Sequence, residues 1–357
     1  MPRADNYAYA VAYVRALRSR LLRAEQYEAL LKTKDDQDAV RYLMDTAYSS
    51  TLSEYSGKTL KLSEIDTAIF EDYHRILKIL MNTRTTSDAK RILDLTHIGH
   101  ELSCLKIIMR LVKAHTPPEK SAQLVAPIGK YSSELILKLL QTRDLRQLFT
   151  ELGDQKIRSI TLDKVAECEK LNSTIPVEIA VDKFHLECLW DAASKLDNWD
   201  RDRVRDIVGT EIDSANISLV LRGKQLGMPF STFQDLMIPM RYKLAQEIEA
   251  AIEAVTSAEA IQALSTSHYG RIISSVAPEC ERERTLLPLE LEMKRFLAER
   301  CSRVFIGYPF GVGPLLAFLK LKYFEALDVR AIFLGKRDRT PIEASRRLLL
   351  SPSLQIK

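Results

Sequence analysis

The sequence has few of the residues that mark disulfide-stabilised, zinc-binding or disordered proteins. Twelve glycines and thirteen prolines in 357 residues are too few for a disordered or collagen-like chain, and the 46% hydrophobic content is sufficient for real cores. The five cysteines are odd in number and scattered, with no C-x-x-C pair, which argues against a disulfide framework or a zinc ribbon and favours a reducing cytoplasm. They are Cys104, Cys168, Cys188, Cys280 and Cys301.

Long hydrophobic runs and a strong excess of one charge are also missing. The longest stretch without a charge, Val304 to Leu319, is shorter than the roughly 20 residues of a spanning helix and contains two prolines. The N-terminus lacks the apolar core and small-residue cleavage site of a secretory signal. With 52 basic and 48 acidic residues the formal net charge is +4, too mild for a dedicated nucleic-acid binder. We therefore expect a cytoplasmic chain that neither crosses a bilayer nor binds nucleic acid.

What the sequence does have is helical periodicity. Long helix-favouring runs such as "YAVAYVRALRSRLLRAEQYEALLK" dominate, whereas sustained alternation with a period of two is hard to find. Between Val204 and Leu219, apolar residues recur at three- and four-residue steps and form one stripe of a helix that must be buried. The pattern predicts an all-α fold.

The sequence also repeats itself, with a period of 112. The repeat aligns Leu105 in "GHELSCLKIIMRLV", Ile217 in "EIDSANISLVLRGK" and Val329 in "YFEALDVRAIFLGK". Four residues before the anchor each segment has an acid, and three and four residues after it each has apolar side chains. The acids are Glu101, Asp213 and Glu325.

Two further matches extend the repeat. Pro127 in "LVAPIGK" matches Pro239 in "LMIPMRY" at the same spacing, and each proline should break a helix and begin a new unit. A weaker match joins Tyr48 in "LMDTAYSS" to Tyr269 in "LSTSHYGR" at close to twice the period. Chance similarity between apolar helices is the alternative explanation, and the repeated proline argues against it.

The repeat predicts three helical units of about 110 residues, which we place at residues 1–118, 119–230 and 231–357. A period of 112 is too long for common solenoids, whose units run about 20 to 50 residues. Three such units more naturally close into a pseudo-threefold body than stack in a line.

The segment "GYPFGVGPLL", residues 307–316, superficially resembles a phosphate-binding loop. Its glycines do not match the P-loop or dinucleotide-binding patterns, and no predicted strand precedes it. Pro314 after these glycines instead indicates the start of a helix.

His97, His100 and Cys104 could share one helical face and hold a metal, with Glu101 nearby. Packing of a polar patch is the commoner explanation, because no fourth ligand of matching type is evident. His185 and Cys188 receive the same interpretation. No nucleophile–base signature such as G-x-S-x-G is present, so the sequence indicates neither an active site nor a cofactor.

Two basic segments could meet an acidic partner, although runs of this kind usually form a solvated helix face. One is "VRALRSRLLR", with Arg15, Arg18, Arg20 and Arg23. The other is the C-terminal "GKRDRTPIEASRRLLL", with Lys336, Arg337, Arg339, Arg346 and Arg347.

Taken together, three segments resemble the C subunit of A/V-type rotary ATPases, known as the d subunit in the eukaryotic vacuolar enzyme. They are "GYPFGVGPLLAFLKLKYFEALDVRAIFLGK", "GTEIDSANISLVLRGK" and "AYAVAYVRALRSRLLRAEQYEALL" with "TAY". The resemblance covers most of the chain and is densest after Phe305. Gly99 and Leu334 depart from the acid and arginine that the middle segment has at Glu211 and Arg222, and Tyr323 replaces the family's usual acid.

This resemblance implies a funnel-shaped, pseudo-threefold rotor subunit of a proton- or sodium-translocating enzyme. Such a subunit has no active site, no cofactor and no small-molecule substrate. It would lie peripherally at the cytoplasmic face of the cell membrane, cap the proteolipid rotor ring and receive the central stalk of D- and F-type subunits. One end would grip the stalk through polar and basic side chains, and less polar surface, including "FIGYPFG", would rest on the ring. The interface residues we expect are Arg15, Arg18, Arg222, Lys224, Phe310, Lys336 and Arg337.

Two other hypotheses belong to different classes. A free-standing helical scaffold with an unrelated client would be a stable monomer indifferent to rotary-ATPase subunits. An enzyme using His97, His100 and Cys104 would contain bound zinc or iron.

Overall fold

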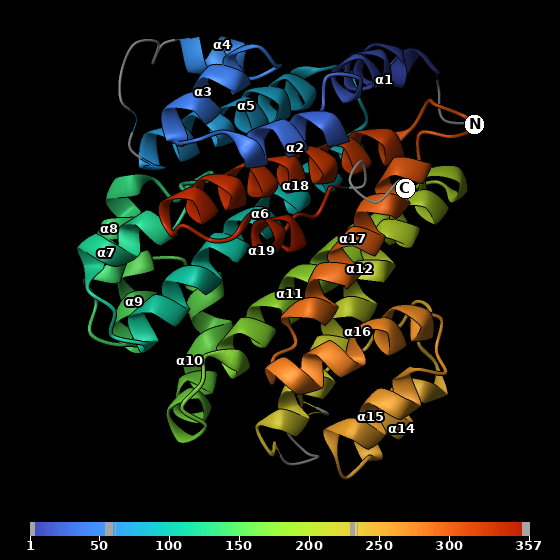
Figure 1. The fold of residues 1–357 in the computed structure, drawn as a ribbon. Coiled ribbons are helices and arrows are strands. Elements are labelled where there is room, and N and C mark those ends of the chain that lie inside the picture. Colours follow the sequence, from blue (N-terminus) through green and yellow to red (C-terminus); the bar gives the residue numbers. More distant parts are fainter. Residues whose placement is uncertain (1–3, 54–59, 61, 229–232, 234, 352–357) are drawn as a thin grey trace.

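The computed structural model describes residues 4–53, 60, 62–228, 233 and 235–351, and its secondary structure is helical (Figure 1). In these residues the only β-type pairing is an isolated bridge between Ile128 and Tyr131. The all-α prediction is confirmed. In the same part of the chain, no helix is both long enough and apolar enough to cross a membrane.

The helices recur in three similar series, each of which ends in one long helix. A series begins with a pair of short helices, continues through two connecting helices and ends in the long helix. The short pairs are α2 (Ala24–Lys32) with α3 (Asp36–Met44), α8 (Ser133–Leu140) with α9 (Leu145–Leu152), and α14 (Gln246–Glu253) with α15 (Ser257–Leu264). The connecting helices are α4 (Ser49–Leu52) and α5 (Leu62–Asn82), α10 (Gln155–Lys170) and α11 (Ile175–Ser194), and α16 (Gly270–Glu283) and α17 (Leu287–Arg303). The long helices are α6 (Ser87–Lys113), α12 (Asn198–Gln225) and α18 (Val312–Arg337).

Four smaller or terminal elements complete the description. They are α1 (Ala4–Arg18), α7 (Pro118–Ser121), the 3-10 turn η2 (Ala122–Leu124) and α19 (Ile342–Arg347). Pro127 and Pro239 both lie in irregular segments between a long helix and the next short pair, which begins with α8 or α14. Each proline therefore stands where the sequence predicts a break between helices.

Local sequence explains where the second helix of each short pair begins. The N-cap side chains of α3, α9 and α15 accept a hydrogen bond from the backbone N–H three residues on, at 2.9, 2.9 and 3.2 Å. These caps are Asp35, Asp144 and Thr256, and the second and third stand one period of the repeat apart. The first and third have the same spacing as Tyr48 and Tyr269. The repeat seen in the sequence thus places the same local signal in each series.

The predicted apolar stripe is confirmed on α12. Val204, Val208, Ile212 and Leu219 are buried, and Ala215 is half-buried. Helix α18 is buried on nearly all sides, and most of its charged residues are buried with it. Because buried charges need partners, α18 is fixed by ion pairs as well as by apolar packing.

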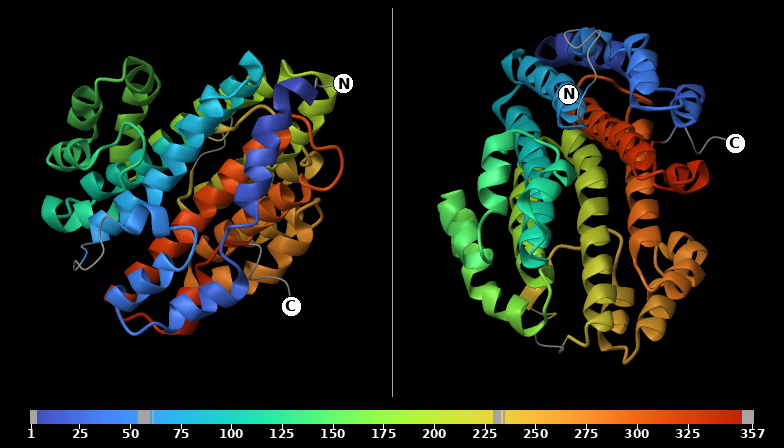
Figure 2. Two further views of the ribbon diagram at one scale, coloured as in Figure 1. Left: turned by 90° about the horizontal axis from the view of Figure 1, so that it is seen from above. Right: turned by 60° about the vertical axis from the view of Figure 1, so that its left-hand side comes forward.

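Helix α18 holds the series together. It contacts both other long helices, α6 and α12, and also packs against α1, α3, α5, α17 and α19. Figure 2 shows this red helix running through the middle of the molecule beside blue N-terminal helices. The C-terminal long helix is therefore covered by N-terminal segments, just as α12 is covered by α14 and α15, the next short pair along the chain.

The three acids aligned by the repeat are all buried and all hold distant groups. Glu101 accepts the backbone N–H of Lys130 at 2.7 Å, and Asp213 accepts that of Tyr242 at 2.9 Å, in both cases 29 residues on. Glu325 accepts the backbone N–H of Leu22. A buried carboxylate here fastens each long helix to the segment that precedes a short pair.

The two tyrosines matched in the sequence occupy equivalent places. Tyr269 donates to Asp213 at 2.8 Å and Tyr48 donates to Glu325 at 2.9 Å. Their backbone N–H groups donate to the hydroxyls of Ser267 and Thr46, two residues earlier. The sequence match between the two tyrosines therefore reflects the same contact with a buried acid. In the case of Tyr48, a residue of the first series contacts the long helix of the third series, α18.

An ion pair between a long helix and a connecting helix is repeated too. Arg110 pairs with Glu178, and Arg222 pairs with Glu290; both pairs span 68 residues. The third series has Leu334 at the arginine position. There Arg330, one helical turn earlier, donates to Asp66 at 3.1 Å, and Asp66 stands one period of the repeat before Glu178. The departure at Leu334 is thus compensated within α18.

Candidate partner-binding surface

His97, His100 and Cys104, which the sequence places on one helical face, do not converge on a common point. His100 Nδ1 lies 2.7 Å from the Tyr73 hydroxyl, and the Cys104 thiol donates to the Ala126 carbonyl at 3.5 Å. His97 Nε2 instead lies 3.5 Å from Glu101. In the described part of the chain, no three His, Cys, Asp or Glu side chains are grouped so that they could hold a metal ion.

Burial also disfavours the charged forms of these cysteine and histidine side chains, which a catalytic site here would need. It raises the pKa of the Cys104 thiol to about 12 and lowers the pKa of His185 to about 3. His100 is stacked on Tyr323, with ring centroids 3.7 Å apart and planes 6° apart, and burial holds its pKa well below the usual range. Tyr323 therefore packs on a neutral imidazole.

Gly99, which stands where the middle segment has the acid Glu211, lies against His185. A side chain at Gly99 would place its Cβ 2.5 Å from His185 Nε2, so the missing side chain makes room for this ring. Cys188 is half-buried on the same helix, α11. Gly99 and His185 thus serve packing between α6 and α11.

The glycine-rich segment leads into α18, which begins at Val312, so Pro314 lies in its first turn. The prediction of a helix start is confirmed. Asp200, at the start of α12, accepts the Val312 N–H at 2.9 Å and is itself buried. A carboxylate of the chain thus occupies the place at which a helix N-terminus would bind an anion.

The loop before α18 contains the predicted interface residue Phe310 and contacts two others, Arg15 and Arg18. Arg15 donates to the Phe305 carbonyl at 2.9 Å, and the Arg18 guanidinium lies 4.4 Å from the centre of the Phe305 ring. Burial and the neighbouring Arg15 lower the pKa of Arg18. Phe310 packs on Tyr308 edge to face, with ring centroids 5.6 Å apart.

The start of α12 completes this surface, which we call the aromatic corner. Trp199 packs on Tyr308, and Arg203 lies 4.9 Å from the Trp199 ring and donates to the Tyr308 carbonyl. Ile306 is 79% exposed and Trp199 49% exposed. The corner therefore presents apolar side chains to solvent among arginines held by cation–π contacts. It consists of Arg15, Arg18, Trp199, Arg203, Phe305, Ile306, Tyr308 and Phe310.

Trp199 and Arg203 were not predicted as site residues. They lie far from the loop in sequence, and only the contact between the start of α12 and the start of α18 joins them. The cluster of aromatic residues in "FIGYPFG" was the available signal, and it indicated the loop alone.

The remaining predicted interface residues are used within the chain. Lys224 donates to the Ile252 carbonyl at 2.6 Å, and Lys336 donates to the Thr33 carbonyl at 2.6 Å. These carbonyls lie at the C-terminal ends of α14 and α2, where cations are favoured. Arg222 pairs with Glu290, and Arg337 pairs with Asp36 at 2.9 Å. A role for them at a partner interface stays a prediction.

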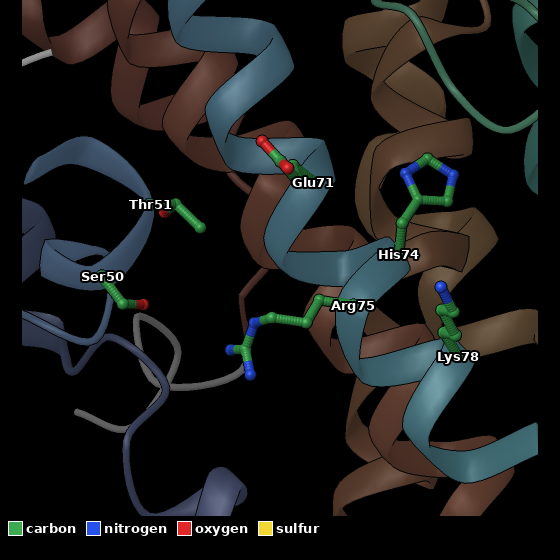
Figure 3. A pocket seen from close by; sticks show the side chains of 6 residues that line it. All are labelled: Ser50, Thr51, Glu71, His74, Arg75 and Lys78. Carbon is green, nitrogen blue, oxygen red and sulfur yellow. The ribbon is translucent and has the colours of Figure 1, made fainter. Parts of the chain in front are cut away.

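A separate pocket lies between α4 and α5 (Figure 3). Its volume is about 540 Å³, and polar and charged residues line it. Arg75, one of them, pairs with Asp72 at 2.6 Å. The lining residues are Ser50, Thr51, Glu71, His74, Arg75 and Lys78.

Comparison with known proteins matches nearly the whole chain. Residues 10–348 match the model of the family described as ATP synthase (C/AC39) subunit. The C subunit of the A-type ATP synthase of Methanocaldococcus jannaschii is 22% identical over 346 residues, which cover 97% of this chain and 86% of the relative. The corresponding protein of Pyrococcus furiosus is 22% identical over 347 residues, covering 96% and 90%, and that of Pyrococcus abyssi 24% over 335 residues, covering 91% and 85%.

Proposed function

The chain belongs to the ATP synthase (C/AC39) subunit family, and on this basis we propose that it is a non-catalytic rotor subunit. In this proposal it links the central stalk of D- and F-type subunits to the membrane ring of proteolipid subunits and transmits torque between them. It lies peripherally at the cytoplasmic face of the membrane. The coupling ion is a proton or sodium.

The observation that supports this role most strongly is the recurrence of the same contacts around the three long helices. Near their N-terminal ends α12 and α18 are joined by Asp200 and Val312, and further along by Lys320 and Glu211, whose charged atoms lie 2.6 Å apart. Towards their C-terminal ends α6, α12 and α18 pack on different short helices. Contacts that recur in this way around three long helices support a pseudo-threefold, funnel-shaped body on a rotation axis as part of the proposal.

The three units we expect, residues 1–118, 119–230 and 231–357, remain part of the proposal. The contacts of Glu325 with Leu22 and Tyr48 suggest how such a body closes. In space the N-terminal short helices complete the C-terminal unit. In this way non-covalent contacts would hold the N-terminal and C-terminal parts of the chain together in one unit.

Torque transmission requires a stiff body, and the ion pairs of α18 suit that requirement. The Lys322 ammonium lies 2.8 Å from both Asp72 and Glu325, and all three side chains are buried. Burial of such charges is tolerated only with close partners, so displacement of α5 against α18 is costly. Dense packing of the surrounding helices adds to the stiffness.

The aromatic corner is the surface we assign to the ring. Its exposed Ile306 and Trp199 form an apolar contact area, and its arginines are oriented by Phe305 and Trp199. The end of the molecule away from the aromatic corner, where α12 and α18 end, is the surface we assign to the stalk. A broad interface at each end, rather than one small pocket, would bear the load.

Purification of the chain with the stalk subunits and the detergent-solubilised ring from the same organism tests the proposal. We expect a stable complex with each at micromolar concentration. A chain that remains monomeric in both mixtures would contradict the rotor role and favour the free-standing scaffold. Metal analysis of the purified protein addresses the enzyme alternative at His97, His100 and Cys104.

A further inference from the structure

Each long helix holds a later segment of the chain through an equivalent side chain. This side chain stands one residue before the anchor of the repeat and bonds to the backbone 22 residues further on. We call these three contacts the joints of the body. The joints are formed by Cys104 with the Ala126 carbonyl, by Asn216 with the Ile238 N–H, and by Asp328 with the Leu350 N–H.

The chain itself secures the first two joints but not the third. After Ala126 the chain runs on into the short pair that begins with α8, and after Ile238 into the pair that begins with α14. The third joint lies against α2, near the N-terminus, where the hydroxyls of Tyr27 and Ser351 are 2.8 Å apart. Non-covalent contacts alone therefore hold the third joint to the short pair beside it.

Residues 348–351, which we call the strap, connect α18 to α2. Asp328 on α18 accepts two consecutive backbone N–H groups of the strap, at 2.6 and 2.8 Å. At the edge of the same joint, Arg346 on α19 pairs with Glu28 on α2 at 2.7 Å, and both side chains are partly exposed. Asp328 is therefore the buried contact of the strap, and the ion pair is its peripheral contact.

Asp328 is the one joint residue of the three that changes charge near neutral pH. Its side chain is 1% exposed, and among the described residues no cation pairs with it. Burial without a counterion disfavours the ionised carboxylate and raises the pKa of Asp328 to about 7. Asn216 carries no charge, and burial raises the pKa of the Cys104 thiol to about 12. The third joint alone thus combines a buried titratable group with a non-covalent connection.

The charged and titratable groups around Asp328 and the strap have partners elsewhere. Lys322 is shared by two other acids, at 2.8 Å each, and Arg295 donates to the carbonyl of Leu349 at 2.9 Å. Burial holds the pKa values of both nearby tyrosines well above the ordinary value, so their hydroxyls stay neutral. None of these groups supplies a counterion to Asp328. They are Glu325 and Lys322 on α18, Asp72 on α5, Tyr27 on α2, Tyr48 at the start of α4, and Arg295 on α17.

We propose that the strap is a pH-sensitive latch, closed on α18 and α2 while the Asp328 carboxyl is neutral and released more readily once that carboxyl is ionised. Release exposes the carboxylate to water, which solvates its charge as the buried joint does not. Release also uncovers the hydroxyl of Tyr27 and loosens the contact between the N-terminal short pair and α18. The inference concerns the closure of the fold and does not depend on the rotor role.

The direction of the pH effect follows from the two states of Asp328. In the released strap its carboxyl is in water and has an ordinary pKa of about 3.9. Between about pH 4 and pH 7 the closed joint holds a proton that the released strap has lost. The equilibrium constant for release should therefore rise about tenfold per pH unit in this range and become constant above about pH 7.

Hydrogen exchange of the full chain, followed by mass spectrometry, measures this release. The protection factor is the intrinsic exchange rate divided by the observed rate. In the peptide that contains Leu350 it should fall about tenfold from pH 5 to pH 6 and level off above about pH 7.5. The peptide that contains Ile238 is the internal control, because the neutral Asn216 holds it, and its protection should change far less.

Two variants separate the effect of ionisation from that of contact. Asp328→Asn gives the third joint the side chain that the second joint has, so the pH dependence at Leu350 should disappear. Glu28→Gln removes the pair with Arg346 and should lower protection about two- to fivefold. That factor should be the same at every pH above 5, because Arg346 holds the pKa of Glu28 below its ordinary value.

The two wild-type peptides decide the question even where a variant does not fold. Protection at Leu350 that does not change with pH, or that falls equally at Ile238, would overturn the inference. A pH dependence retained by Asp328→Asn, or unchanged protection in Glu28→Gln, would overturn it as well.

Discussion

The carboxylate of Glu325 on α18 accepts a hydrogen bond of 2.9 Å from the hydroxyl of Tyr48, 277 residues away in the sequence. The same carboxylate pairs with Lys322 and accepts the backbone N–H of Leu22. These groups are buried. One side chain thus joins the N-terminal helices to the last long helix, and its contacts allow direct tests.

Removal of the Tyr48 hydroxyl should destabilise the fold. In Tyr48→Phe the buried Glu325 loses one donor, and we expect the free energy of unfolding to fall by about 1–3 kcal/mol. Urea denaturation followed by circular dichroism measures the change. Tyr131→Phe is the matched control, because the Tyr131 hydroxyl is buried without a hydrogen-bond partner among the described residues. That variant should be neutral or slightly stabilised, and an equal loss in both would contradict the assigned contact.

The compensating ion pair at Arg330 should also be measurable. In Arg330→Leu the carboxylate of Asp66, which is 1% exposed, loses its counterion, and we expect a loss of about 3–5 kcal/mol. The double variant Arg330→Leu with Asp66→Leu should recover much of that loss, since no unpaired charge then remains buried. Unfolding of the two single variants and the double variant completes the cycle. Additive losses would show that the two residues do not interact.

Asp200 should make stability depend on pH. Burial, and to a lesser extent the neighbouring Asp197, raise its pKa to about 6. Between about pH 4 and pH 6 the folded chain holds a proton there that the unfolded chain has lost, so this contribution to stability falls as pH rises and is constant above pH 6. It amounts to about 3 kcal/mol at most.

The variant Asp200→Asn isolates this effect, because it retains an oxygen to accept the Val312 N–H but carries no charge. We expect its stability relative to wild type to increase from pH 4 to pH 6.5 and then to level off. Urea denaturation at several pH values measures the difference. Asp94→Asn, on an exposed helix face, controls for the loss of one negative charge. A difference that stays constant across this pH range would contradict the assignment.

Substitution of Ile306, an exposed apolar residue of the aromatic corner, should affect assembly without affecting folding. Ile306→Ser should change the free energy of unfolding by less than about 0.5 kcal/mol, because the side chain is 79% exposed. Binding to the detergent-solubilised ring should weaken. Val255→Ser is the control: Val255 is 86% exposed and lies between α14 and α15, at the opposite end of the molecule from the corner in Figure 1. Equal binding by wild type and Ile306→Ser would exclude this residue from the ring interface.

Part of the candidate surface could be predicted from sequence and part could not. The loop "FIGYPFG" was expected at an interface from the family resemblance, and the arginines of α1 from their charge. The two do meet, through Arg15, Arg18 and Phe305. Lys224 and Lys336 were predicted as contacts for partners, yet they bind carbonyl groups at the ends of α14 and α2. A basic side chain looks the same in sequence whether its acceptor belongs to its own chain or to another.

The sequence by itself determined the helices, their caps and the threefold repeat, because these depend on residues within a few turns of one another. Apolar spacing defines the buried stripe of α12, and Asp144 and Thr256 begin equivalent helices. The tertiary structure alone decided which segments meet. Tyr48 reaches Glu325, and Arg330 replaces the arginine missing at Leu334. These outcomes depend on how helices far apart in the sequence close on one another, and local periodicity does not specify that choice.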